Sequence, residues 1–544
     1  MRTQSTALSS SINKPSPITG NKFALRSDSR DMTTEKSTHA AAFNNARLFY
    51  KESDAGSRLA ELNAIIAKGN TGEELTGDQK VFYDIYKELV GIDTTGGVGT
   101  LKAAKAVEKR LADAGFSPED IQIFEVGKDE ANIVATLRGT GELKPVMGLA
   151  HYDVVGADAT EWETPPFELT EKQGKFGPEY RGRGAIDDKA MAASLIATLI
   201  RLKKQPGGYK GKRDIRVALT TGEEKGGGNG VPWLIKNKPD IFKDVEFAIN
   251  EGGYGDLDEN GKPKSLTLQT GEKIPMYFDM EATGTPSHSA YPPEGSKRAN
   301  NILAKAITKI DEYEFPIQIN ETTRDYFTKM RAYEKDEKKL KAIDAFLKGS
   351  TDKKKLAPLL EDKTYSSQLS TTVAATKIIV GDTEQEVADY WKVPNNALPQ
   401  KVRMKVNVRL MPGTKAEDVQ KELEKAINDP NVKLTVSFAA LESPFSPLDP
   451  VIVDSVGKIS KRIWGDNFPV IATMSAGATD SRFLRNLGIP TYGLQGLLVG
   501  ENTGNEHGPN EWGLKKAIHD SDDFIASFLK DISDKSLTVS TKKT

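Results

Sequence analysis

Short apolar runs of strand length recur through the first half of the chain. Each run is rich in Val, Ile, Leu and Ala and is bounded by polar or glycine-containing stretches, which is typical of buried strands. Four of them are ANIVATLRG, PVMGLAHYDVV, DIRVALTTGEE and VEFAINEGG. Helical patterns separate several of these runs. Strands that alternate with helices predict an α/β fold, a mostly parallel sheet with helices on both faces.

The helical patterns are amphipathic and carry ordinary end signals. In TLKAAKAVEKRLADAG, residues 100–115, the apolar residues share one face and the helix is expected to stop at Gly115. A second helix is predicted for DKAMAASLIATLIRLKK at 188–204, and residues 46–90 also read as helical. GLKKAIHDSDDFIASFLKDI predicts a helix near the end of the chain.

The pattern changes near residue 273. KIPMYFDMEATGTPSHSAYPP reads as an alternating strand and a loop, VRMKVNVRLMPG as an edge or half-exposed strand, and VKLTVSFAAL as another strand. Helical patterns lie between them, including a highly charged stretch at 310–370. This order predicts a small α+β domain over 273–445, inserted in a catalytic domain that is formed by 46–272 and 446–544.

Composition restricts the chemistry. The chain has 544 residues, of which 75 are basic and 77 acidic, so its charge gives no reason to expect nucleic acid or an anionic membrane as a partner. No apolar run is long enough for a membrane span. Cysteine is absent, which excludes disulfides, thiolate ligands and cysteine nucleophiles. Any metal would have to be held by His, Asp and Glu.

Residues 1–45 are rich in Ser, Thr, Asn and Lys and lack the apolar core of a secretory signal. We expect them to form a disordered or processed tail. A chain without cysteine suits the cytosol and the periplasm equally. Sequence therefore leaves two locations open, the cytoplasm and the periplasm or exterior after removal of a leader.

Histidines and carboxylates gather where the predicted strands end. In open α/β sheets, ligands bind beyond the carboxyl ends of the strands. A pair of metal ions needs a bridging carboxylate, terminal His and carboxylate ligands, and an open position for water. The segments that supply these groups are AHYDVV with His151 and Asp153, GRGAIDDKA with Asp187 and Asp188, TTGEEKGG with Glu223 and Glu224, NEGG with Glu251, and the distant GNEHGPNE with His507.

Each of these signals is weak alone. A single His is more often structural than a ligand, and an adjacent acidic pair usually lies on a solvated surface. GEEKGGGNG is not a phosphate loop, because it lacks the Gly-Lys-Ser/Thr ending and its acidic pair would repel phosphate. On an irregular loop, however, Glu223 and Glu224 can point to different places. One can then bind metal while the other moves a proton.

The combined order His-x-Asp, Gly-Arg-Gly-Ala-x-Asp-Asp-Lys, Glu-Glu, Glu and a late His resembles a zinc peptidase family over roughly residues 75–530. That family includes carboxypeptidase G, carboxypeptidase S, aminoacylases and succinyl-diaminopimelate desuccinylase. The long charged insert is most similar to the carboxypeptidase S branch. The resemblance implies two Zn²⁺ per chain, with Co²⁺ or Mn²⁺ as substitutes. The implied metal ligands are His151, Glu224, Glu251, His507 and the bridging Asp187.

The same resemblance assigns the remaining roles. Glu223 would be the general base, and Asp153 would orient His151 from behind. GTPSHSAYP, NNALP and VNVRLMPG are similar to the family's lid domain. There His288 would stabilise the carbonyl oxygen in the transition state, often across a homodimer interface. Asn396 and Arg409 would contact the substrate, with Arg409 paired to a free carboxylate.

These implications favour a metal-dependent hydrolase that cleaves a peptide or N-acyl amide bond next to a free carboxylate, as a carboxypeptidase-like exopeptidase does. An N-acyl amino acid amidohydrolase is the alternative. A non-catalytic relative is disfavoured by the complete ligand set and by Glu223. An aminopeptidase is disfavoured because His288 and Arg409 suit an anionic end better than a free amine. His39 and His519 lie outside every motif, so both are expected to be dispensable for activity.

Overall fold

The computed structural model describes residues 75, 77–380, 395–441, 443–500 and 504–538. Its largest sheet has ten strands in the order β1-β2-β6-β3-β7-β17-β9-β8-β18, with β16 paired to β9. The bounds are β1 Ile121–Gly127, β2 Glu130–Leu137, β3 Val146–His151, β6 Ile215–Thr220, β7 Phe247–Asn250, β8 Gly255–Leu257, β9 Pro263–Glu272, β16 Val470–Ser475, β17 Thr491–Gly493 and β18 Leu498–Val499.

The centre of this sheet is parallel. Neighbours from β6 through β3 and β7 to β17 run in the same direction. The strands β1 and β2 are antiparallel and lie at one side. The four runs singled out in the sequence are β2, β3, β6 and β7, and the predicted α/β fold with a mostly parallel sheet is confirmed.

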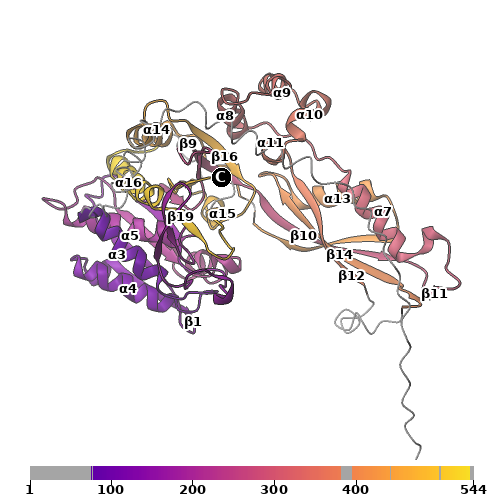
Figure 1. Ribbon diagram of the computed structural model, residues 1–544, viewed down its shortest axis with the longest axis horizontal. Helices are drawn as coiled ribbons and strands as arrows, with labels where there is room; N and C mark the ends of the chain where they lie inside the picture. Colours follow the sequence, from indigo (N-terminus) through magenta and orange to yellow (C-terminus); the bar gives the residue numbers. More distant parts are fainter. Residues whose placement is uncertain (1–74, 76, 381–394, 442, 501–503, 539–544) are drawn as a thin grey trace, which may run out of the picture. The chain divides into compact units, whose positions relative to one another are not determined.

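Helices cover both faces of the large sheet (Figure 1). Successive side chains of a strand point to opposite faces, and here Val217 lies in one core while Ala218 lies in the other. The core with Val217 also contains side chains from α3 (Gly77–Val90), α4 (Thr100–Asp113), α5 (Lys189–Lys204), α14 (Pro450–Trp464) and α16 (Lys515–Asp531). The opposite core contains side chains from α6 (Val231–Asn237) and α15 (Ser481–Asn486).

Helix α5 approaches β3 very closely. A Cβ atom on Gly148 of β3 would lie 2.5 Å from Cδ2 of Leu195 on α5, so any larger residue at this crossing would require the Leu195 side chain to shift. Several positions of α5 are alanines, whose short side chains let the helix lie close to its neighbours. The helix is buried over most of its length. The contact fixes the start of α5 near the end of β3. The segment before α5 carries Asp187, and β3 ends at His151.

A second, four-stranded sheet has the order β12-β14-β10-β15, and we call it the lid sheet. Its strands are β12 (Thr372–Val380), β14 (Lys401–Leu410), β10 (Ile274–Thr283) and β15 (Val432–Ala439). They pair antiparallel, and α7 (Ala299–Asp311) and α13 (Ala416–Ile427) share its core. Buried and half-buried residues alternate along β14, which is an inner strand and not an edge. Only Lys273 separates β9 of the large sheet from β10, at the predicted domain boundary.

The charged insert forms α8 (Glu321–Met330), α9 (Glu337–Leu347), α10 (Lys353–Leu360) and α11 (Lys363–Leu369). These helices share a core with Ile471 of β16. The Gln368 side chain accepts a hydrogen bond from the Met474 amide at 3.0 Å and donates one to the Met474 carbonyl at 2.8 Å. These two bonds satisfy the backbone groups of Met474 at the outer edge of β16. An unpaired strand edge would otherwise be open to pairing with another chain. We propose that these helices belong with the catalytic domain.

Two small sheets complete the described part of the chain. One joins β11 (Ser287–His288) to β13 (Ala397–Leu398), and the other has the order β19-β5-β4, formed by Trp512–Leu514, Gly177–Arg181 and Thr170–Gly174. Within the described residues, none of the helices combines the length and the apolar character that a membrane span requires. The predicted tail at 1–45 and most of the predicted helical stretch before Gly77 lie outside the described residues.

Candidate active site

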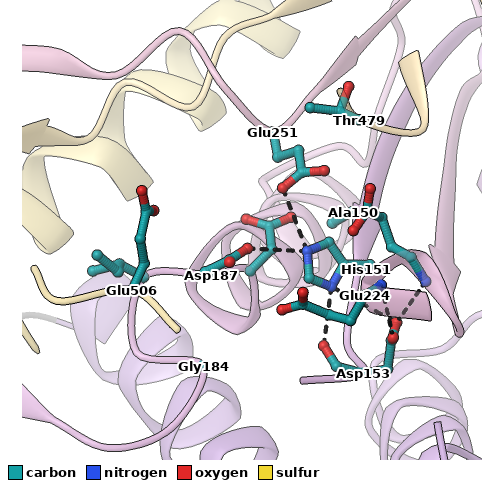
Figure 2. Close-up of polar contacts among 12 residues, drawn as sticks. Ala150, His151, Asp153, Gly184, Asp187, Glu224, Glu251, Thr479 and Glu506 are labelled. Atoms are coloured by element: carbon teal, nitrogen blue, oxygen red, sulfur yellow. Dashed lines mark hydrogen bonds and ion pairs between the residues drawn. The ribbon is translucent and has the colours of Figure 1, made fainter. Parts of the chain in front are cut away.

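His151 is the last residue of β3, and its ring faces two carboxylates. Its Nε2 atom lies 3.0 Å from Oδ1 of Asp187, which precedes α5, and 3.4 Å from Oε2 of Glu251, which follows β7. Figure 2 shows the ring with Asp187 and Glu251 on one side and Asp153 on the other. Because β3 and β7 are parallel neighbours, their carboxyl ends meet at one edge of the sheet. This first triad is almost fully buried.

A second triad uses the other oxygen of Asp187. Nε2 of His507 lies 2.9 Å from Oδ2 of Asp187 and 3.2 Å from Oε2 of Glu224. Within each triad, one ligand atom from every residue lies within 4.8 Å of the others. The structure thus brings together all five residues that the sequence nominated as metal ligands, and each histidine faces a different oxygen of Asp187.

The donor set fits a pair of divalent cations. It consists of imidazole nitrogens and carboxylate oxygens, which zinc and its first-row neighbours accept. The crowding of negative charge shifts the pKa values of the residues in this cluster. Burial, followed by the charge of Asp187, raises the pKa of Glu224 to about 7. The hydrogen bond to Asp187 raises the pKa of His507 to about 9. Cations between these groups would relieve the repulsion among the carboxylates.

Asp153 has two distinct contacts behind this cluster. The Nδ1–H of His151 donates to the backbone carbonyl of Asp153 at 3.0 Å, which leaves Nε2 free to face the cluster. The Asp153 carboxylate lies 3.7 Å from Nδ1. That carboxylate accepts the backbone N–H groups of Glu223 at 3.3 Å and Glu224 at 3.2 Å. Asp153 therefore joins His151 to the acidic pair, a contact that the sequence did not reveal.

The loop with the acidic pair is a short 3₁₀ turn, Glu223–Lys225, directly after β6. It is flanked by Gly222 and Gly226, whose φ angles of 79° and 91° are left-handed and favour glycine. Glu223 is half-buried. Burial and then the neighbouring charge of Glu251 raise the pKa of Glu223 well above its ordinary value. This carboxylate therefore holds a proton more readily than a solvated glutamate does.

The three residues nominated on the inserted domain are His288, Asn396 and Arg409. His288 is exposed on β11, its Nδ1 accepts the Ala290 N–H at 3.1 Å, and its Nε2 lies 3.1 Å from the Asn396 side-chain nitrogen. Arg409 is half-buried on β14. Burial and the charge of Arg409 lower the pKa of the nearby Lys273 to about 8. The described contacts of His288 include none with the triads, and the roles of these residues stay predictions.

Three further carboxylates near the site were not given roles from the sequence. Asp188, Asp480 and Glu511 are almost fully buried. The Gln495 side chain donates to Asp188, and burial raises the pKa of Asp480 to about 7. Asp188 and Glu511 lie in GRGAIDDKA and GNEHGPNE, two segments already noted, and Asp480 lies in GATDSRF. The sequence does not indicate that these three carboxylates are buried, because a local pattern does not distinguish a buried carboxylate from a solvated one.

His519 lies elsewhere, in α16, where its Nε2 is 3.1 Å from the Tyr180 hydroxyl and its ring packs against Phe82. Burial lowers the pKa of His519 from 6.5 to about 4. Between these values the unfolded chain binds a proton that the folded chain does not, so this residue should lower the free energy of unfolding as pH falls from 6.5 to 4. We expect His519→Gln to retain full turnover and to lose that part of the pH dependence.

Urea unfolding of both proteins at pH 7.5 and pH 5 measures this effect. If the free energy of unfolding depends on pH identically in the parent protein and in His519→Gln, His519 is not the cause of that dependence. A large loss of turnover in His519→Gln would show that the residue belongs to the active site. The other unassigned histidine, His39, lies outside the described residues.

Comparison with known proteins gives a family and several relatives. The model of peptidase family M20/M25/M40 matches residues 148–531. The chain is 29% identical over 385 residues to the N-fatty-acyl-amino acid synthase/hydrolase PM20D1 of Xenopus tropicalis, covering 69% of this chain and 70% of that protein. It is 32% identical over 194 residues to a probable succinyl-diaminopimelate desuccinylase of Staphylococcus aureus, covering 35% of this chain and 42% of that protein.

Solved structures share the fold at low identity. The M20 family metallo-carboxypeptidase Sso-CP2 from Sulfolobus solfataricus matches with a TM-score of 0.57 and 18% identity, covering 83% of this chain and 98% of that chain. Human carnosine dipeptidase 1 matches with a TM-score of 0.55 and 16% identity, covering 84% and 98%. At these identities the likeness concerns the fold alone. The predicted kinship with the carboxypeptidase S branch stays a prediction.

Proposed function

The chain belongs to peptidase family M20/M25/M40, a family of metal-dependent hydrolases, and from this premise we propose that it cleaves the amide bond next to a free carboxylate in small peptides or N-acyl amino acids. The single observation that carries the proposal is the pair of triads that share Asp187. A bridging carboxylate between two sets of terminal ligands is the arrangement that hydrolases with two metal ions use.

We propose two Zn²⁺ per chain as the cofactors. His151 and Glu251 would hold one ion, Glu224 and His507 the other, and Asp187 both. When bound, such ions polarise the amide carbonyl and lower the pKa of water. The second contact of His151, from Nδ1 to the Asp153 carbonyl, fixes the ring so that Nε2 faces the cluster.

Glu223 is the proposed general base. Its carboxylate would take a proton from the attacking water and deliver it to the nitrogen of the leaving amine. Burial keeps the pKa of Glu223 high, which supports both halves of this transfer. The Asp153 carboxylate holds the Glu223 backbone and so limits where the base can move.

Arg409 is the proposed anchor for the free carboxylate. No described carboxylate forms an ion pair with its guanidinium, whereas Arg403, six residues earlier on β14, is paired with Glu281 at 2.8 Å. A guanidinium recognises a carboxylate through two parallel hydrogen bonds. N-acyl amino acids are a specific second candidate to peptides, because the relative from Xenopus tropicalis is named for fatty-acyl-amino acids. Both substrate classes present the same carboxylate.

The metal proposal has a direct test. Protein reconstituted with excess zinc and dialysed should approach two zinc ions per chain by elemental analysis. A chelator should abolish hydrolysis, and zinc or cobalt should restore it. His519→Gln is the matched control, because it removes an imidazole outside the cluster and should leave zinc content unchanged. Full activity in metal-free protein would contradict the proposal.

The substrate proposal predicts a loss confined to substrates with a free carboxylate. Arg409→Ala should lower kcat/KM about 10- to 100-fold for such substrates, the cost of one hydrogen-bonded charge pair. The loss should fall mainly on KM, and C-terminal amides should be affected little. Arg403→Ala is the control on the same strand. A panel of dipeptides and N-acyl amino acids, each as acid and amide, measures the effect. Equal cleavage of acids and amides by the parent protein would exclude recognition of the carboxylate.

A further inference from the structure

Glu511 is fully buried and lies four residues after His507, yet the proposed mechanism leaves it without a role. Its Oε1 accepts the backbone N–H groups of Ile186 at 2.8 Å and Asp187 at 3.2 Å. Its Oε2 accepts the Gly184 N–H at 2.9 Å and an N–H of the Arg183 guanidinium at 2.7 Å. One carboxylate therefore receives four hydrogen bonds from the loop that ends at Asp187.

The same two segments are also joined by two bonds to backbone carbonyls, again with the loop before Asp187 as the donor. Arg183 donates from Nη2 to the backbone carbonyl of Gly508, the residue next to His507, at 2.9 Å. The Gly182 N–H donates to the backbone carbonyl of Glu511 at 3.1 Å. The ion pair between Arg183 and Glu511 is itself buried, with side chains 2% and 0% exposed. Residues more than 300 positions apart are thus tied by six bonds beside the Asp187–His507 contact.

On the basis of the proposed two-ion centre, we infer that Glu511 and Arg183 are positioning residues that hold Asp187 and His507 in register, so that one carboxylate bridges both ions. The loop from Gly182 to Asp187 is irregular, and its buried N–H groups need acceptors from outside. Glu511 supplies them. It does not touch the triad side chains in any described contact, so it acts through the backbone of Asp187.

The two triads should depend on this clamp unequally. His151 ends β3 and Glu251 follows β7, so the sheet itself positions them. His507 lies in a loop with a left-handed φ of 61° and has no such support. Loosening the clamp should let His507 and one oxygen of Asp187 move apart while the first triad keeps its sheet-borne ligands. The ion held by Asp187, Glu224 and His507 should therefore be lost first.

Glu511→Gln tests the clamp, because glutamine keeps the shape but turns one acceptor into an N–H₂ group that faces N–H donors. Changes behind metal ligands usually weaken metal affinity about 10- to 100-fold. We expect that loss for the second zinc in competition with a zinc chelator of known affinity, with a smaller change for the first. At limiting zinc, kcat should fall with KM nearly unchanged, and excess zinc should restore much of it.

Asp522→Asn is the matched control for a purely structural role. Asp522 is also a buried carboxylate, 3% exposed, and it pairs through both oxygens with Arg201 at 2.7 and 2.6 Å, between α16 and α5. This variant should lower thermal stability and leave both zinc affinities unchanged. If Glu511→Gln fails to fold, Arg183→Gln tests the same link, because it leaves the three backbone bonds of Glu511 in place.

The outcomes separate the two proposals. Parent protein that binds two zinc ions, together with a variant that binds both as tightly and only melts earlier, would overturn the clamp and spare the proposed function. Parent protein that binds fewer than two ions would overturn both. Selective loss of the second ion in Glu511→Gln, and not in Asp522→Asn, is the result that the clamp requires.

Discussion

Replacing Glu223 with glutamine should lower kcat by about 10²–10⁴-fold, the usual effect of losing a general base, with little change in zinc content. Glutamine retains the size of the side chain but cannot accept the proton of the attacking water. The structure gives Glu223 a half-buried position after β6, and burial beside Glu251 raises its pKa. A side chain in this setting holds a proton readily during turnover.

Glu224→Gln is the matched comparison, one residue along the same turn. Oε2 of Glu224 lies 3.2 Å from Nε2 of His507, inside the second triad. This variant should lose zinc, and added zinc should recover part of its activity. Parallel measurement of kcat and zinc content on both variants separates the two roles. Turnover close to that of the parent chain in Glu223→Gln would show that another group is the base.

The sequence predicted the part of the site that depends on strand ends. A run of buried residues that stops at a polar residue locates the carboxyl end of a strand, and parallel neighbours bring such ends together. His151 and Glu251 agree with this reasoning in the structure, because β3 and β7 are adjacent and parallel. Asp187 and His507 lie in irregular segments that the reasoning does not bring together. The roles of all four as metal ligands were implied by the family resemblance.

The rest of the site depends on contacts between distant segments. The hydrophobic periodicity of a helix or strand shows which of its faces is buried, but it does not show which other element packs against that face. The sequence therefore predicts that the charged insert belongs to the inserted domain, and our proposal to assign it to the catalytic domain depends on Gln368 and Ile471, which join its helices to β16. In the same way, the pattern HGPNE does not show that Glu511 accepts bonds from the loop before Asp187.

His288→Ala should lower kcat by about 10²–10³-fold, the usual effect of removing one donor to a developing oxyanion. This task needs a hydrogen on Nε2, which agrees with Nδ1 accepting the Ala290 N–H and requires the Asn396 amide to turn its oxygen, and not its nitrogen, toward the ring. That atom faces Asn396 in the described contacts. Asn396→Ala is the companion variant, and a smaller loss is expected because Asn396 is predicted to contact the substrate and not to donate to the oxyanion.

Mixing two inactive variants tests whether His288 serves the site of a second subunit. In a homodimer that shares residues across its two-fold axis, chains with His288→Ala and Glu223→Gln would combine to leave one site with both groups intact. Random exchange makes half of the dimers hybrids with one working site of two, so about a quarter of the parent activity should return. Copurification of differently tagged chains confirms the exchange. A mixture that exchanges and stays inactive would contradict the shared site. His288 would then act only within its own chain.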